Sequence, residues 1–225
     1  MDYLTLMKTF PDLFNNEDAL IKIVLAPDVI EAWQAERREQ LLARNQSQDW
    51  AEIGVVFEDP YFFIVRDLVQ FPDGRMSGYC RVLSQADLNG GGGVVILTEY
   101  QGKVMLLNHY RHPTRQWHYE MPHGYGEANT PPAVNARKEV LEETGGEIEE
   151  LVELGEFYNN TGFQGRAVSL FYARLGSIGT PDNSEDIESF VWLTVPELEE
   201  WIAEGKISDG FTIAAYTKAK LKGLI

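Results

Sequence analysis

The sequence predicts an α/β (α+β) fold in which strands alternate with a few helices, and three observations lead to this prediction. Short runs of apolar and β-branched residues recur between turn residues, which is typical of strands and hairpins. Charged segments with apolar residues at helical spacing begin near Pro27, before Gly145 and near Thr194. A hydrophobic content of 44% over 225 residues is enough for an ordinary core.

The first part of the chain is expected to contain a helix and then a hairpin. From about Asp18 to Gln46, "PDVIEAWQAERREQLLARNQ" places apolar residues among charged ones, after a start at Pro27. Two strand-like runs flank the turn "PDGR", which predicts a β hairpin. The next glycines, "NGGGG", lack the ending of a P-loop and are expected to form a hinge. We divide the chain into a helical extension, 1–55, a hairpin, 56–92, and a main domain, 93–225.

The main domain is expected to alternate strands and helices. "VVILTEYQGKVMLLNHYRH" predicts two strands around a Gln-Gly turn, and "EFYNN", "AVSLFYARL" and "FVWL" predict three more. Thr194 and Glu197 predict a capping box at the start of one helix, with Pro196 inside it. A last helix is expected from about Asp209 to Lys222.

Composition narrows the class of protein. With 19 Lys and Arg against 35 Asp and Glu, the net charge is −16, which argues against a general nucleic-acid binder. The single cysteine, Cys80, permits no intrachain disulfide and suits a reducing compartment. No apolar run reaches the roughly 18 residues of a membrane span, and the start lacks the features of a signal peptide. We therefore expect a cytoplasmic protein without membrane contact.

The stretch "ARKEVLEETGG" carries the strongest chemical pattern. Glu139, Glu142 and Glu143 are spaced to share one face of a helix that ends at Gly145. There they repel one another and the negative end of the helix dipole, and a bound Mg²⁺ or Mn²⁺ would remove both penalties. A solvated acidic face, with Lys138 paired to Glu142, is the open alternative.

The residues before this helix resemble the Nudix hydrolases. The family box is Gly, five residues, Glu, seven residues, Arg-Glu, a hydrophobic residue, any residue, Glu-Glu, any residue, Gly and a hydrophobic residue. In this chain the same spacing starts at Gly124 and reaches Glu139, Glu142 and Glu143. The three departures are Thr130 for Glu, Lys138 for Arg and Gly146 for a hydrophobic residue. Thr130 is expected to cap the helix, with Pro131 at its first position.

The resemblance extends to the ADP-ribose pyrophosphatase-like subfamily over about residues 56–225. "NHYR", ending at Arg111, and "EMPHG", from Glu120 to Gly124, stand where that subfamily has "Q-Y-R" and "W-E-x-P-A-G". "FPDGRMSGYCRVL" and the last helical segment are also similar to it. The implied fold is an α/β/α sandwich around a mixed sheet, preceded by the helical and hairpin extension.

The resemblance implies a metal-dependent hydrolase of nucleoside diphosphate derivatives. Its metal ligands would be Glu139, Glu142, Glu143 and the main-chain carbonyl of His123, and its substrate-binding residues Arg111, Glu120 and Gly124. Glu142 and Glu143 would be catalytic, together with a base from the loop "NSEDIESF", where Glu185 is the first candidate and Glu188 the second. The subfamily's dimers further imply a homodimer, formed through the hairpin, in which each copy completes the other's pocket.

Other readings stay open. Thr161 in "YNNTGF" replaces a proline that accompanies ADP-ribose preference, so the expected substrate is ADP-ribose or another nucleotide sugar. The altered box also allows a catalytically weak, nucleotide-binding or regulatory protein. The four histidines between His109 and His123 could hold zinc, although no cysteine accompanies them. The aromatic run from Tyr61 to Phe63 could stack on a base but is more typical of a core.

Overall fold

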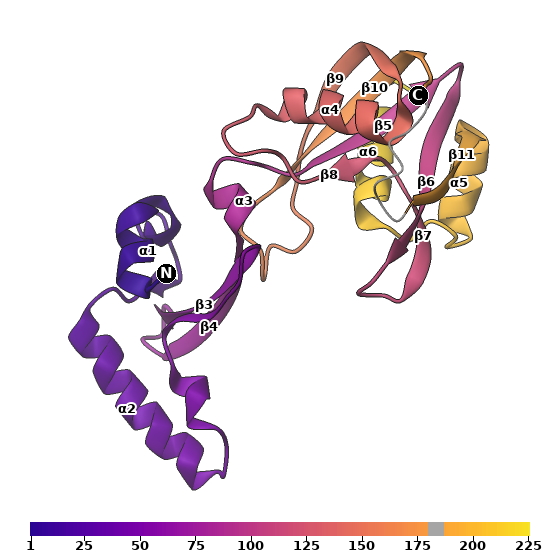
Figure 1. The fold of residues 1–225 in the computed structure, drawn as a ribbon. Helices are drawn as coiled ribbons and strands as arrows, with labels where there is room; N and C mark the ends of the chain where they lie inside the picture. Colours follow the sequence, from indigo (N-terminus) through magenta and orange to yellow (C-terminus); the bar gives the residue numbers. More distant parts are fainter. Residues whose placement is uncertain (180–186) are drawn as a thin grey trace. The chain divides into compact units, whose positions relative to one another are not determined.

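The computed structural model describes residues 1–179 and 187–225, and the chain forms two compact units (Figure 1). The first unit consists of Met1–Leu88 with Asn160–Gly165, and the second of Asn89–Asn159 with Arg166–Ile225. Within the described stretches, no helix has both the length and the apolar character needed to cross a membrane.

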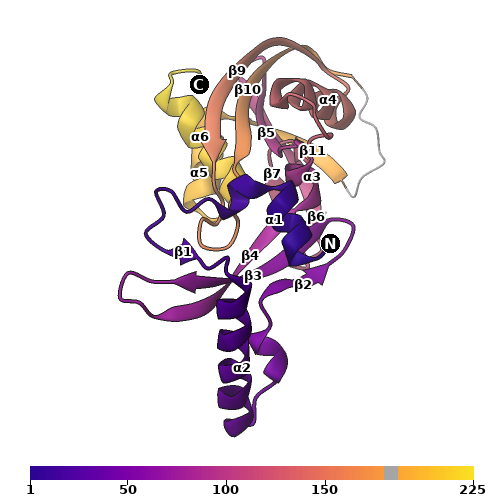
Figure 2. The ribbon, with the colours of Figure 1, turned by 90° about the vertical axis from the view of Figure 1, so that its left-hand side faces the viewer.

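The first unit combines helices with a small antiparallel sheet (Figure 2). Its elements are α1 (Tyr3–Thr9), η1 (Pro11–Phe14), β1 (Lys22–Ile23), α2 (Pro27–Ala43), η2 (Gln48–Ala51), β2 (Gly54–Glu58), β3 (Phe62–Gln70), β4 (Met76–Ser84) and α3 (Gln85–Leu88). The predicted hairpin is confirmed, because β3 and β4 pair along their whole length. At its turn the Phe71 N–H donates to the Arg75 carbonyl over 2.9 Å, and Gly74 supplies a φ of 84°.

The helix expected from about Asp18 starts later than predicted. α2 begins at Pro27, a residue suited to a first helical turn, and the preceding backbone is extended. There β1 pairs with β3, and the Asn16 side chain bonds both the N–H and the carbonyl of Ile23 over 2.8 Å. These tertiary contacts take backbone groups that a longer helix would have used internally.

The core of the first unit lies between α1, η1 and the sheet. Leu6 and Phe14 pack there against Phe63 and Val65 of β3. Beside them the carboxylate of Asp67, which is 3% exposed, accepts a hydrogen bond from Tyr3 over 2.6 Å. Burial, together with the charge of Asp67, raises the pKa of the Tyr3 phenol above its usual range.

The second unit is built on one large sheet. Its elements are β5 (Val94–Tyr100), β6 (Lys103–Arg111), β7 (Gln116–Glu120), β8 (His123–Gly124), α4 (Pro132–Thr144), β9 (Glu147–Phe157), β10 (Val168–Ser177), β11 (Ile187–Thr194), α5 (Val195–Ala203) and α6 (Gly210–Leu221). The strand order is β11-β6-β5-β10-β9, with β7 beside β6 and β8 beside β5. β5 and β10 are parallel while the other pairs are antiparallel, so the sheet is mixed.

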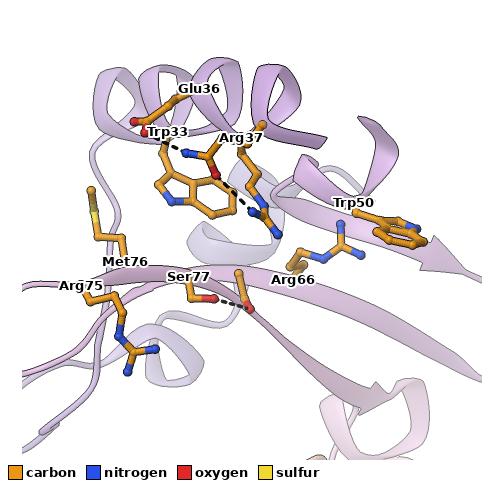
Figure 3. Close-up of a pocket in the computed structure, with 10 residues that line it drawn as sticks. Trp33, Glu36, Arg37, Trp50, Arg66, Arg75, Met76 and Ser77 are labelled. Carbon is orange, nitrogen blue, oxygen red and sulfur yellow. Dashed lines mark hydrogen bonds between the residues drawn. The ribbon is translucent and has the colours of Figure 1, made fainter. Parts of the chain in front are cut away.

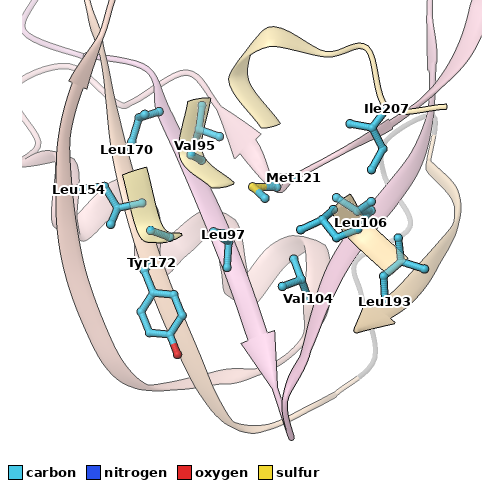
Figure 4. Packing of buried hydrophobic residues seen from close by; sticks show 13 residues of the cluster. Val95, Leu97, Val104, Leu106, Met121, Leu154, Leu170, Tyr172, Leu193 and Ile207 are labelled. Carbon is cyan, nitrogen blue, oxygen red and sulfur yellow. The ribbon is translucent and has the colours of Figure 1, made fainter. Parts of the chain in front are cut away.

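Alternate residues of β5 pack on opposite faces of this sheet. Val94 and Ile96 belong to a buried cluster that includes Ala136 and Val140 of α4. Val95 and Leu97 belong to a second cluster, formed with residues of α5 and α6 (Figure 4). Helices therefore cover both faces, and the predicted α/β/α sandwich with a mixed sheet is confirmed.

Two helix ends of the second unit agree with the sequence prediction. Thr194 and Glu197 form the expected capping box at the start of α5, and Asp209 caps α6. β9 is longer than the sequence predicts. It starts at Glu147, whereas "EFYNN" predicts only its end. Its many glutamates are not typical of a strand, and pairing with β10 along its length stabilises it.

Candidate active site

The loop that leads into α4 passes very close to that helix. A side chain at Gly124, in β8, would overlap the carboxylate of Glu139, so glycine is what lets this carboxylate lie against the strand. A side chain at Gly126 would overlap the amide group of Asn135. The box glycine therefore has a direct structural role, because it sets the distance between β8 and the first glutamate.

The three glutamates of α4 differ in exposure. Glu143 is buried, at 5% exposed, whereas Glu139 is half-buried and Glu142 is exposed. The helix ends as predicted at Gly145, which has a φ of 61° and donates its N–H to the Leu141 carbonyl over 2.8 Å. The carboxylates thus occupy the last turns of α4, where the helix dipole disfavours negative charge.

Lys138, which stands in place of the box arginine, has two carboxylate neighbours. Its ammonium group hydrogen-bonds Glu127 in the preceding loop and lies 3.8 Å from a carboxylate oxygen of Glu142. These carboxylates, Glu127 first, raise the pKa of the Lys138 ammonium group. Glu127 therefore gives Lys138 the loop partner that Thr130 cannot provide.

The predicted cap of α4 is wrong. Pro131 occupies the N-cap position and makes no side-chain bond, while the Thr130 hydroxyl donates to the Ala128 carbonyl over 3.4 Å. Asn135, which is 2% exposed, holds the loop instead. Its amide accepts from the Glu127 N–H over 3.3 Å and donates to the Thr130 carbonyl over 3.4 Å. A contact of this kind depends on the fold of the loop and has no short-range sequence pattern.

Arg111, Glu120 and His123 form a polar cluster at the ends of β6, β7 and β8. Arg111 donates through Nε and Nη2 to one carboxylate oxygen of Glu120, over 2.7 and 2.6 Å. The same guanidinium group hydrogen-bonds Nε2 of His123, whose Nδ1 bonds the Met121 carbonyl over 2.7 Å. Glu120 is 4% exposed, so a buried carboxylate fixes the arginine head group.

Residues at the N-terminal end of α6 contact the segment that carries Glu120 and His123. The Met121 N–H donates over 3.0 Å to the hydroxyl of Thr212, which in turn donates over 2.7 Å to Asp209. The ring of Phe211 lies 5.9 Å from that of His123, between centroids. Sequence reasoning identified Asp209 as the start of a helix but missed this supporting role, because the contact spans 91 residues.

His123 and Gly124 connect the two halves of the candidate site. His123 contacts Arg111, and the next residue in β8 contacts Glu139 of α4. The structure therefore brings the predicted arginine, Glu120, the β8 segment and the first glutamate of α4 into one region of the second unit. Glu185 lies outside the described residues.

The residues present fit a hard divalent cation. Glu139 and Glu143, four residues apart, offer oxygen donors on the side of α4 that faces the protein, and Glu142 stands beside them. Among residues 1–179 and 187–225 no three His, Cys, Asp or Glu side chains already enclose a metal position. The histidine-rich stretch thus forms no preassembled zinc site there, since His112 bonds Arg115 and His118 bonds Thr114.

Comparison with known proteins agrees with this architecture. The family model of the NUDIX domain matches residues 90–211. The methanol dehydrogenase activator of Bacillus methanolicus is 27% identical over 161 residues, which cover 69% of this chain and 83% of the relative. The ADP-ribose pyrophosphatase of Bacillus subtilis is 25% identical over 162 residues, which cover 72% and 80%.

Solved structures show the same fold. The crystal structure of an ADP compounds hydrolase superposes with a TM-score of 0.65 at 16% identity, covering 76% of this chain and 91% of that one. The domain match spans more than half of the sequence and contains the whole loop and helix described above. The chain therefore belongs to the Nudix family.

Proposed function

We propose that this protein hydrolyses the diphosphate linkage of a nucleoside diphosphate derivative, either ADP-ribose or another nucleotide sugar, with Mg²⁺ or Mn²⁺. The observation that carries the proposal is the approach of β8 to α4, where Gly124 leaves room for the Glu139 carboxylate. The acidic end of α4 thus lies next to β8, whose His123 hydrogen-bonds Arg111 of β6. Positive and negative groups suited to a metal–diphosphate complex are thereby close together.

Each residue has a proposed role. Glu139, Glu142, Glu143 and the main-chain carbonyl of His123 would hold the cation, which supplies charge neutralisation and water activation when bound. Arg111 would bind phosphate oxygens, since a guanidinium group suits bidentate contact with an oxyanion. Its orientation is already fixed by the buried carboxylate of Glu120, over 2.6 Å. The proposed general base remains Glu185.

A second candidate function is nucleotide binding or regulation with little catalysis. It is favoured by the position of Lys138, whose ammonium group lies 3.8 Å from Glu142 and so places a cation beside one proposed ligand. The box departures at Thr130 and Gly146 are also compatible with it.

A panel of diphosphate compounds, assayed with Mg²⁺ on the wild type and on Glu143→Gln, separates the two functions. We expect turnover of at least one nucleotide sugar, its loss with chelator, and a fall in kcat of roughly 10²-fold or more in the variant. Glu149→Gln is a matched control, because Glu149 is exposed and its carboxylate lies 3.5 Å from Arg174 on the sheet. Ligand binding without turnover, equal in wild type and Glu143→Gln, would contradict the hydrolase.

We further propose a homodimer formed through the hairpin and a cytoplasmic location. The dimer is supported by the free edge of β4. One edge of this strand pairs with β3, and the other carries, among the described residues, one isolated bridge, Val82↔Gln164, so that edge is available for pairing with a second copy. The location is supported by the single thiol, Cys80, which is free. Light scattering at micromolar concentration tests the assembly, and a monomer there would count against it.

A further inference from the structure

The first unit contains a pocket of about 460 Å³ in a part of the chain that the Nudix domain match does not cover. It lies between α2, η2 and the β3–β4 hairpin (Figure 3). Trp33 and Arg37 face it from α2, Trp50 from η2 and Arg66 from β3. Its size falls within the range of small-molecule sites, about 300 to 1,000 Å³.

Polar contacts fasten the walls of this pocket to one another. Arg66 Nη1 donates to the carbonyl oxygens of Asp49 and Glu52, over 3.1 and 2.8 Å. The side chain of Gln34, on α2, accepts from the Ile53 N–H over 2.8 Å. Arg38 Nη2 lies 2.6 Å from the Glu52 carboxylate. The helix, the 3-10 turn and the sheet are therefore joined independently of any ligand.

A glycine makes room for one of the arginines. Gly78, in β4, stands opposite Leu68 in the strand pairing, and a Cβ there would come within 2.9 Å of Arg66 Cδ. With hydrogen at this position the arginine side chain lies across β4 and reaches η2. The guanidinium group is thus held at the pocket.

The pocket collects positive charge on a protein whose net charge is −16. Arg37 Nη1 donates to the Gln40 side chain over 3.2 Å, and Arg66 donates to main-chain carbonyls. In the described part of the chain neither guanidinium group forms an ion pair within 4.0 Å. The nearby carboxylate of Glu36 accepts from Gln40 over 2.9 Å. Two arginines in one pocket repel each other, and a bound anion would relieve that repulsion.

Two indole rings accompany these charges. Trp50 is 55% exposed and Trp33 is half-buried, and Figure 3 shows Arg37 and Arg66 between them. An exposed indole offers a flat surface on which a planar ring can stack, while a guanidinium group binds phosphate. We propose that this pocket is a second binding site, distinct from the box, for a nucleoside monophosphate or a similarly small phosphorylated ring compound.

Calorimetric titration of the full chain with AMP, in the presence of chelator, tests the proposal. AMP has no diphosphate linkage, so its binding is measured without turnover. We expect Arg37→Gln to weaken AMP binding by about tenfold, because it removes one charge-assisted contact. Trp50→Ala should also weaken AMP binding by about tenfold, because the base loses its stacking partner. Adenosine and inorganic phosphate should each bind much more weakly than AMP.

Arg44→Gln is the matched control, because Arg44 lies at the C-terminal end of α2, is exposed and is not one of the residues that line the pocket. It should leave AMP affinity unchanged, and Arg37→Gln should keep the thermal midpoint of the wild type. Equal AMP affinity in the wild type and both arginine variants would overturn the proposal, as would an absence of binding to the wild type. Inorganic phosphate binding as tightly as AMP would overturn the assignment of a ring-bearing ligand.

Discussion

The helices α4 and α2 have similar sequences in outline but are held in different ways. Both have a proline as their first residue and consist mainly of charged and small residues. α4 buries five residues against the large sheet, including Asn135, Val140 and Glu143. α2 is longer and buries one, Leu41. The side chains on the inner face of α4 are therefore positioned by packing, whereas those of α2 are positioned by polar contacts such as Arg38–Glu52.

This difference indicates where chemistry and where adaptable binding can reside. A carboxylate such as Glu143 can be kept in an unfavourable place only if the surrounding structure fixes it. Apolar packing of α4 on the sheet provides that stability. Arg37, by contrast, is half-buried, and the charged end of its long side chain can adjust at little cost, which suits reversible binding of an anion.

The largest effect is expected where the inner face of α4 meets β8. Gly124→Ala would place a methyl group in the space of the Glu139 carboxylate. The end of that flexible side chain can move away, so the fold should persist, but a displacement of about 1 Å at a catalytic position can cost about 100-fold in rate. We expect kcat to fall by about that factor with little change in Tm.

Gly92→Ala is the control for this experiment, because an added Cβ at Gly92 meets nothing within 4 Å. Its activity and Tm should match those of the wild type. Full activity in Gly124→Ala would show that the position of Glu139 against β8 does not matter.

The packing difference itself can be measured with two equivalent truncations. Val140, on α4, is fully buried, and Val29, on α2, is 36% exposed. Val140→Ala should lower the free energy of unfolding by about 2 kcal/mol, whereas Val29→Ala should change it by less than about 0.5 kcal/mol. Urea unfolding provides both values, and equal losses would mean that α2 is packed as firmly as α4.

The stability of the first unit should depend on the core near α1 rather than on α2. Tyr3→Phe removes the hydrogen bond to Asp67, of 2.6 Å, and should cost about 1 to 2 kcal/mol at neutral pH. Because the pKa of Tyr3 is raised in the folded protein, the unfolded chain loses this proton first as the pH rises. The stabilisation is complete below the ordinary phenol pKa of about 10 and declines above it.

Urea unfolding of the wild type and Tyr3→Phe at several alkaline pH values measures this effect. The variant should lose less stability than the wild type between pH 9 and pH 11, taken as about one unit either side of the ordinary phenol pKa. Tyr172→Phe is a useful comparison from the second unit, because burial and Glu99 raise the pKa of Tyr172 to about 12. If the free energies of unfolding of the wild type and Tyr3→Phe changed with pH in parallel, the Tyr3 phenol would not be the source of the alkaline loss of stability.

Much of the fold was predictable because its determinants are local. The hairpin turn, the capping box at Thr194 and the end of α4 at Gly145 each follow from a few adjacent residues. β9 and the start of α2 were not predicted correctly, because pairing with distant strands decides them. Such pairing outweighs local propensity in both segments.

The candidate site likewise combines features that follow from local sequence patterns with contacts that depend on distant residues. The box spacing pointed to the three glutamates, and the resemblance of "NHYR" to the subfamily's "Q-Y-R" pointed to Arg111, because each of these patterns is local in the sequence. The contacts that hold the site were not predictable, because Asn135 depends on a loop conformation and Thr212 reaches Met121 across 91 residues. The sequence pointed to Glu142 as the partner of Lys138, whereas its hydrogen bond is made to Glu127, which the fold of the loop brings beside it.

The smallest effect is expected on the outer face of α4, which resembles α2 in its exposure. Lys138 and Glu127 are 48% and 60% exposed, and ion pairs between side chains as exposed as these contribute little to stability. Lys138→Met should therefore leave the urea midpoint of unfolding almost unchanged. The substitution Lys138→Met also removes the positive charge that lies beside Glu142. The Mg²⁺ concentration for half-maximal activity should thus fall by up to about fivefold, as expected for unit charges about 4 Å apart in water. A tenfold loss of kcat with unchanged Mg²⁺ dependence would instead mean that Lys138 acts together with the packed side of the helix, which carries the proposed metal ligands Glu139 and Glu143.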